Sequence, residues 1–145
     1  MTEKFELQVK AFKKMEDPTL STGRAKYVCY VKADSIPAAF VNWMGTNPRE
    51  QKMNTNVAKR IIKSLEDNSN FHELNRGILM SVEDINFDNK SNIATIKMSD
   101  PMLHGNIDGG HTLRAILDNK VKLDSILSDR YVFFEFITDL ESPVD

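Results

Sequence analysis

The stretch from Gly105 to Ile116, GNIDGGHTLRAI, carries the residue types and spacing in this chain that are best suited to chemistry. Gly109 and Gly110 lie between a strand-like segment, residues 92–99, and a helix-like segment that begins near His111. At such a turn the first helical N–H groups lack backbone partners, and the helix dipole presents its positive end. Because glycine also lets a ligand approach the backbone closely, the pattern predicts an anion site, with phosphate or carboxylate as the expected ligand.

The candidate ligand-binding residues of this turn all fall in the loop or on the first turns of the following helix. They are Asp108, Gly109, Gly110, His111, Thr112 and Arg114. We expect Gly109, Gly110 and His111 to offer backbone N–H groups, with a left-handed backbone angle at Gly110 that glycine tolerates. Thr112 would add a hydroxyl donor, and His111 would bind an anion more tightly when protonated. The alternative is a purely structural turn in which Asp108 caps the helix and Arg114 is solvated.

Two other short stretches place asparagine and arginine next to a proline or glycine that sets the backbone conformation. The first contains Asn47 and Arg49 on either side of Pro48, and the second is Asn75, Arg76 and Gly77. The planar fork of arginine suits phosphate or carboxylate, although an Asn-Arg-Gly corner also suits a plain turn. We predict that at least one of these arginines lies in the same cleft as the glycine turn, because ligand sites collect at element ends.

Several kinds of chemistry find no motif in this chain. The histidines His72, His104 and His111 do not have metal-site spacing, and no lysine follows the glycines as in a phosphate-binding P-loop. No Gly-x-Ser-x-Gly marks a nucleophilic serine. Asp100 and Asp108 flank the glycine loop and could hold a divalent ion, but loop aspartates more often cap turns. We therefore predict no metal ligands and leave the cofactor and any catalytic residue unassigned.

Length and composition set the class of protein. A chain of 145 residues fits one domain, and 19 Lys+Arg against 21 Asp+Glu give a net charge of -2, which argues against broad non-specific DNA binding. The one cysteine, Cys29, lies in a strand-like pattern, so we interpret it as a core residue in a reducing compartment. No apolar run reaches membrane-spanning length, so the expectation is a cytoplasmic protein without a membrane partner.

Hydrophobic periodicity predicts a mixed α+β fold. Alternation or β-branched and aromatic content predicts strands at Phe5–Val9, Tyr27–Val31, Ile78–Val82, Ile93–Lys97 and Val132–Ile137. Helices are expected at about Thr55–Glu66 and His111–Asp118, with Val57, Ile61, Ile62 and Leu65 forming the buried stripe of the first. Residues 77–84 are interpreted as one strand that forms a hairpin with 92–98.

The segment from Ala33 to Met44 is less clearly patterned. Asp34 or Ser35 is a possible cap of a short helix with Pro37 near its first turn. Its predicted apolar face consists of Phe40, Val41, Trp43 and Met44.

Taken together, the order of these motifs resembles a known family. Asn-Pro-Arg at 47–49, an amphipathic helix, Phe-x-x-x-Asn-Arg-Gly-Ile at 71–78, a hairpin and Asp-Gly-Gly-His-Thr-x-x-Ala-Ile at 108–116 resemble the N-terminal region of abortive-phage-infection AIPR proteins. The resemblance covers about residues 27–137. The glycine turn is also similar to that of DGQHR-domain proteins and to the phosphate loop of the ParB/sulfiredoxin-like fold.

The resemblance implies a fold of the ParB/sulfiredoxin-like type, a mixed sheet with flanking helices, and a phage-defence domain that binds nucleic acid or a phosphate-bearing ligand. The sequence departs at Thr112, where the similar loops have arginine, and at Gly110, where sulfiredoxin has its catalytic cysteine. The alternative function is a nucleotide hydrolase or metal-dependent nuclease that uses His111 and Asp108. Because AIPR proteins are usually much longer, residues 1–145 are expected to be one N-terminal domain. Its expected partners are a nucleotide or nucleic acid, and either the remainder of a longer chain or further copies of itself.

Overall fold

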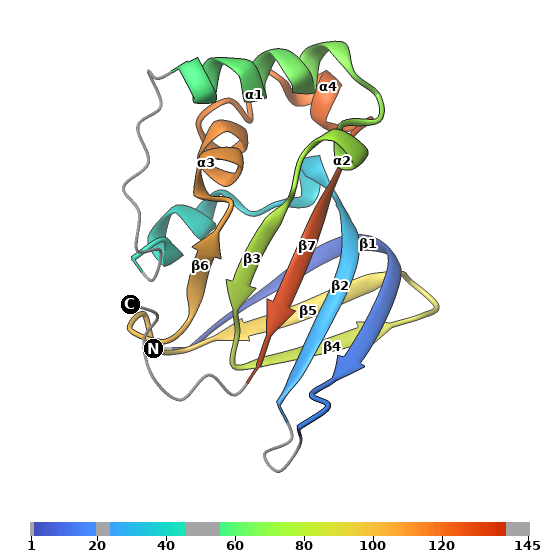
Figure 1. The fold of residues 1–145 in the computed structure, drawn as a ribbon, viewed down its shortest axis with the longest axis vertical. Helices are drawn as coiled ribbons and strands as arrows, with labels where there is room; N and C mark the ends of the chain where they lie inside the picture. The colour runs from blue at the N-terminus through green and yellow to red at the C-terminus, as the bar shows by residue number, and fades with distance from the viewer. Residues whose placement is uncertain (1, 20–23, 46–55, 139–145) are drawn as a thin grey trace.

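The computed structural model describes residues 2–19, 24–45 and 56–138. In this part of the chain seven strands form one mixed sheet, in the spatial order β4-β5-β1-β2-β7-β3-β6 (Figure 1). The strands are β1 (Glu3–Glu16), β2 (Ala25–Lys32), β3 (Ile78–Ser81), β4 (Asp84–Asp88), β5 (Ile93–Met98), β6 (Gly105–Asp108) and β7 (Tyr131–Ile137). The α+β class and all five predicted strands are confirmed.

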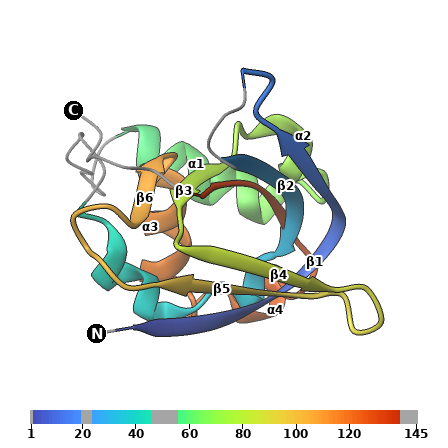
Figure 2. The same cartoon turned by 90° about the horizontal axis from the view of Figure 1, so that it is seen from below.

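The two N-terminal strands hold the sheet together. β1 pairs with β5 through its first half and with β2 through its second half, and β2 in turn pairs with β7. The register shifts between Lys10 and Lys13, where Ala11 has a φ of 56°, so a bulge bends β1 as it passes from one neighbour to the other. Seen from below, the sheet is strongly curved, with β1 sweeping around its outer side (Figure 2).

The interpretation of residues 77–84 as one strand of a hairpin was wrong. β3 ends at Ser81, and it pairs in parallel with β7 and antiparallel with β6. A separate strand, β4, begins at Asp84 and pairs with β5 across the turn after Asp88. Val82 donates its N–H to Ile137 and Glu83 donates to Lys97, so the chain changes neighbours between these two residues. Apolar alternation runs to Val82, breaks at Glu83 and Asp84, and resumes out of phase at Ile85, and this break was the available signal for the change of neighbours.

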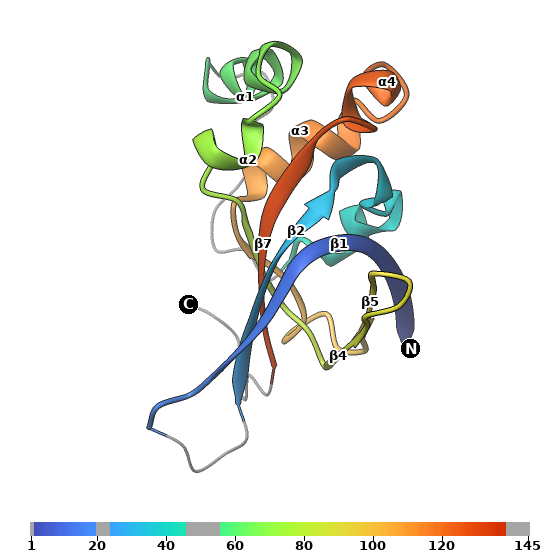
Figure 3. The same cartoon turned by 90° about the vertical axis from the view of Figure 1, so that its right-hand side faces the viewer.

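Two longer helices and several short helical segments pack on the sheet. They are α1 (Asn56–Asp67), α2 (Phe71–Leu74), α3 (Gly110–Asp118) and α4 (Asp124–Leu127), with 3-10 segments at Ala33–Ser35 and Ala38–Trp43. Figure 3 shows α2 on one side of β2 and β7, and the 3-10 segments and α4 on the other. No helix in the described ranges is both long and apolar enough to cross a membrane.

The core lies between the sheet and the helices on the side opposite α2. Alternate residues of β2 and β7 enter it, including Cys29, Val31, Phe134 and Phe136. From the helices, buried Leu113 and Ile116 of α3 and Phe40 and Trp43 of the second 3-10 segment pack against them.

The segment from Ala33 to Met44 differs in detail from the expectation. It forms two 3-10 turns instead of one helix, because Pro37 lacks an N–H and holds the extended conformation between them. Ser35 does not cap a helix: its hydroxyl donates to the Lys32 carbonyl and accepts from the Gln8 N–H. Val41 is 43% exposed, so it does not belong to the apolar face.

Candidate functional site

A cavity of about 990 Å³ lies where α1, α2, β3 and the start of α3 meet. Helix α3 begins directly after the edge strand β6, and its first turn therefore opens into the space beneath α1 (Figure 1). The residues that line the cavity come from four segments: Val57, Arg60, Ile61 and Ser64; Phe71, Leu74, Asn75, Arg76, Gly77, Ile78 and Leu79; Asp108, Gly109, Gly110, His111 and Thr112; and Glu135.

The cavity brings together two of the three stretches that the sequence singled out. Arg76 lines it together with the whole Asp108–Thr112 turn, so one arginine does share a cleft with the glycines. Asn47 and Arg49, the other predicted pair, lie outside the described residues.

Asn75 fastens these two stretches to each other. Its side-chain amide donates to the Thr112 hydroxyl at 2.9 Å, and its carbonyl oxygen accepts from the Gly77 N–H at 2.8 Å. Both polar ends of the amide are therefore used within the corner and the helix start. The lone pair of Thr112 that accepts from Asn75 is occupied, which leaves the hydroxyl hydrogen of Thr112 as its donor.

Two glycines allow the Asn75–Gly77 corner and the glycine turn at Gly109 to contact each other. Gly109 has φ +75°, and a Cβ there would lie 2.2 Å from the Gly77 carbonyl oxygen. Gly77 has φ +87°, and a Cβ there would lie 2.2 Å from the Phe133 carbonyl oxygen. Residues with a side chain rarely adopt these positive φ angles, and a Cβ would also clash, so both positions require glycine.

The expectation of a left-handed angle at Gly110 was wrong by one residue. Gly110 is the first residue of α3 and is absent from the described residues with positive φ, whereas Gly109 is the cap in the left-handed region. A helix needs helical angles from its first position onward, so the sharp change of direction falls on the residue before it.

The predicted N–H donors are only partly available. The Asp108 carboxylate accepts from the Gly109 N–H at 2.9 Å, so this group is already paired with an anion of the protein itself. Gly109 provides no side chain to cap α3. The N–H groups of Gly110 and His111 consequently remain the first-turn donors that helix geometry leaves without intrahelical partners.

Buried Asn106 holds the strand that carries Asp108. Its amide donates to the Leu79 carbonyl at 3.2 Å and to the Asp108 carbonyl at 2.7 Å, next to the register shift between Leu79 and Met80. Asn106 was not selected from the sequence. The signal for it was an amide side chain inside a short apolar strand, where a polar group needs partners.

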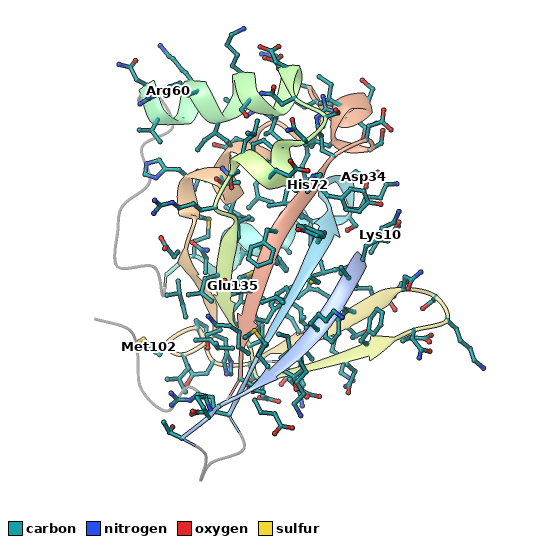
Figure 4. The ribbon with its side chains drawn as sticks, turned by 45° about the vertical axis from the view of Figure 1, so that its right-hand side comes forward. Lys10, Asp34, Arg60, His72, Met102 and Glu135 are labelled. Atoms are coloured by element: carbon teal, nitrogen blue, oxygen red, sulfur yellow. The ribbon has the colours of Figure 1, made fainter. Side chains whose placement is uncertain are left out.

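The charged side chains of the cavity are of both signs. Arg60 and Arg76 supply positive charge from α1 and from the corner, while Asp108 and Glu135 supply negative charge. The Glu135 carboxylate lies 3.4 Å from the Lys26 ammonium group, so its charge is compensated from the neighbouring strand. Figure 4 shows Arg60 on α1 and Glu135 on β7, at different levels of the molecule.

Arg60 and Glu135 were missed as site residues. Arg60 follows Val57 by three positions and precedes Ser64 by four, which places all three on one face of α1, and that spacing was the available signal. Val57, expected in the buried stripe, is 45% exposed and lies at the cavity, because this face meets open space.

Arg114 was predicted to bind the ligand, but the structure does not bring it into the cavity. Its Nε donates to the Asp118 carboxylate at 3.1 Å, an ion pair between residues four apart on α3. One helical turn separates the two residues, which favours this local pairing on the outer side of the helix.

Of the three histidines, His111 lines the cavity and His72 and His104 do not. His104 is buried, and its Nδ1 accepts from the backbone N–H groups of Ser99 and Asp100 at 3.1 and 3.0 Å. Burial lowers the pKa of His104, and nearby Glu83 and Asp100 partly oppose this shift. Asp100 accepts from the Met102 N–H, so it caps a turn. Among the described residues no group of three or more His, Cys, Asp or Glu side chains is placed to hold a metal ion.

Comparison with known proteins assigns the family. The family model described as AIPR protein matches residues 45–143, which include every residue that lines the cavity. Searches of curated proteins and of solved structures gave no significant match. β1 and β2 precede the matched region, yet they join β5 to β7 in the sheet. The chain belongs to the AIPR family, and its general role is phage defence by abortive infection.

Proposed function

We propose that this phage-defence domain binds a phosphate-bearing ligand, a nucleotide or a nucleic acid, in the cavity at the start of α3. The observation that carries the proposal is the shared cavity, in which the first turn of α3 meets the arginines Arg60 and Arg76. N–H donors at a helix start favour an anion, and arginine adds a planar pair of donors for phosphate oxygens.

The exposed position of Asp108 supports a ligand that contacts the N–H groups at the buried start of α3. Asp108 is exposed and already satisfied by the Gly109 N–H, while Gly110 and Thr112 are buried. A phosphate would therefore contact the N–H groups of Gly110 and His111 and the Thr112 hydroxyl, with Arg76 closing the site from the corner. The resemblance of the turn to the ParB/sulfiredoxin-like phosphate loop supports this placement.

The apolar side of the cavity indicates more than inorganic phosphate. Val57, Ile61, Phe71 and Leu74 line it, and Leu74 is 60% exposed at its rim. Small-molecule sites typically have volumes of roughly 300–1,000 Å³ and combine apolar walls with a few polar groups. The combination fits a ligand with a phosphate at one end and a ring or other apolar part at the other, as in a nucleotide.

Calorimetric titration with inorganic phosphate and with nucleotides tests the proposal. We expect Arg76→Gln to weaken nucleotide binding about tenfold or more, since a hydrogen bond to a charged group contributes about 1.5–3 kcal/mol. Arg114→Gln is the matched control, because it removes the same group from the same domain outside the cavity. Wild-type affinity in both variants, or no binding by the wild type, would reject the proposal.

The alternative of a hydrolase or metal-dependent nuclease rests on Asp108 and His111, which both line the cavity. It predicts turnover of a bound nucleotide or oligonucleotide in the presence of Mg²⁺ or Mn²⁺. Product analysis by chromatography, with His111→Asn as the control, distinguishes it from binding alone.

A further inference from the structure

The face of the sheet opposite the core carries aromatic rings and lysines below α2. We call it the open face and define it by Lys10, Lys13, Tyr30, Lys32, Tyr131 and Phe133. The strand register places these residues on one side: Lys10 pairs with Tyr30 and Tyr30 with Phe133, while Lys32 pairs with Tyr131 and Lys13 with Val28. Directly paired residues share a face, and the alternate residues Cys29, Val31 and Phe134 fill the core.

The rings of the open face are held in place by their neighbours. Tyr30 and Phe133 are half-buried and meet edge to face, with ring centroids 5.9 Å apart. His72 of α2 packs against Tyr30 at 5.1 Å, from the upper end of the face. Figure 4 shows His72 above Lys10 and Glu135. Rings fixed in this way can receive a stacked base at little further cost in conformational entropy.

The lysines give the open face a positive charge. Lys10 and Lys13 are exposed, and the Lys10 ammonium group lies 5.3 Å from the Tyr131 ring centroid. Two acidic residues at the border are already paired: Asp34 lies 3.6 Å from Lys32, and Glu135 lies 3.4 Å from Lys26. Lys10 and Lys13 form no ion pair within the described ranges, so their charges are available to a polyanion, while Glu73 lies at the far end of the face beside His72.

The open face meets the cavity along β7 and β3. Phe133 lies directly beside Gly77, where a Cβ would fall 2.2 Å from the Phe133 carbonyl oxygen. Glu135 and Leu79, the next pair on the same face of these strands, line the cavity itself. A chain of nucleotides could therefore extend from one surface to the other.

We propose that the open face binds single-stranded nucleic acid, with bases stacked on the rings of Tyr30 and Phe133 and phosphates held by Lys10 and Lys13. Aromatic rings on an open sheet face, interspersed with cations, are suited to unpaired bases. Because every base has a flat face that can stack, such binding does not require a particular nucleotide sequence. A duplex hides the faces of its bases and meets only the lysines. This proposal goes beyond the cavity and does not need the cavity to bind phosphate.

Fluorescence anisotropy with a labelled oligothymidylate of about 12 nucleotides, at about 50 mM salt, measures this binding against a duplex of equal length. We expect the single strand to bind more tightly than the duplex. Lys10→Ala combined with Lys13→Ala should weaken it and reduce the slope of log affinity against log salt by about 1.4, for two lost phosphate contacts. The control pair, Lys90→Ala with Lys122→Ala, removes two exposed lysines elsewhere and should change neither quantity.

A second pair of variants tests the stacking. Tyr30→Leu should weaken binding about tenfold, whereas Tyr27→Leu, the same change on the opposite face of β2, should leave it unchanged. Circular dichroism shows whether each variant folds. If Tyr30→Leu does not fold, the lysine variants alone test whether the open face binds the single strand. Absent binding of the single strand, equal binding of the duplex, or equal loss in the control lysine pair would overturn the proposal. Arg76→Gln with a mononucleotide tests the cavity separately.

Discussion

The side-chain amide of Asn75 donates a 2.9 Å hydrogen bond to the hydroxyl of Thr112, although 37 residues separate them in the chain. This bond joins the corner before β3 to the first turn of α3. Because Asn75 also accepts from the Gly77 N–H, it fixes the corner and the helix start at the same time. Both residues line the cavity, so their hydrogen bond fixes two of its walls relative to each other.

Replacing Asn75 should destabilise the domain. Asn75→Ala removes one hydrogen bond to Thr112 and leaves the Gly77 N–H without its partner, and buried or half-buried groups left in this way cost about 1–3 kcal/mol. Urea denaturation measures the free energy of unfolding. Asn86→Ala is the control, since exposed Asn86 donates to the Asp84 carboxylate at the surface, and its loss should cost no more than about 0.5 kcal/mol. Equal effects in the two variants would contradict the role assigned to Asn75.

The two glycines of the turn should respond differently to alanine. Gly109→Ala forces a residue with a side chain into positive φ and places its Cβ against the Gly77 carbonyl, so we expect a loss of at least about 2 kcal/mol. Gly110→Ala places alanine at the first helical position, where its angles are ordinary, and should cost less. Thermal unfolding of both variants gives the comparison. A larger loss at Gly110 would place the strained residue where the sequence alone suggested it.

His104 should make the stability depend on pH in a mildly acidic range. Burial lowers its pKa in the folded state below the ordinary value of 6.5. Because the pKa is lowered, the contribution of neutral His104 to the free energy of unfolding is fully present above pH 6.5. This contribution is lost as the pH falls through the pKa of the folded state. Protonation would also remove the Nδ1 lone pair that accepts from the Ser99 and Asp100 N–H groups.

His104→Asn tests this assignment, because the amide oxygen can replace Nδ1 as acceptor without taking up a proton. The melting temperature of the variant should fall less between about pH 7.5 and about pH 5 than that of the wild type, a window of about one to two units around the reference value of histidine. A wild-type profile in His104→Asn would show that another group is responsible.

Cys29 should be unreactive in the folded protein. Its side chain is 1% exposed, and burial raises the pKa of the thiol to about 12. Since the thiolate is the reactive form, a thiol reagent at about pH 8 should modify the native protein far more slowly than the denatured chain. Absorbance with an aromatic disulfide reagent follows both rates. Rapid modification under native conditions would indicate that β2 opens or that the thiol is accessible.

The sequence by itself determined five of the seven strands that the structure describes, the two longer helices and the position of the glycine turn. Each depends on a local pattern: alternation in β2 and β7, a 3.6-residue stripe in α1, and glycines before an apolar helical run in α3. The order of the same motifs also pointed to the AIPR family, and the family model confirms it. Such patterns are local because burial of one face imposes the same period wherever a helix or strand packs.

Only the tertiary structure decided which of these residues form the site. Arg60 and Glu135 line the cavity, Arg114 turns to Asp118, and β4 rather than β3 pairs with β5. The contact between Gly109 and Gly77 explains why the left-handed residue is Gly109, since the backbone there must approach another backbone that is 32 residues away along the chain. Contacts of this kind depend on which elements the sheet order makes neighbours, and the local period of a segment contains no information about its neighbours.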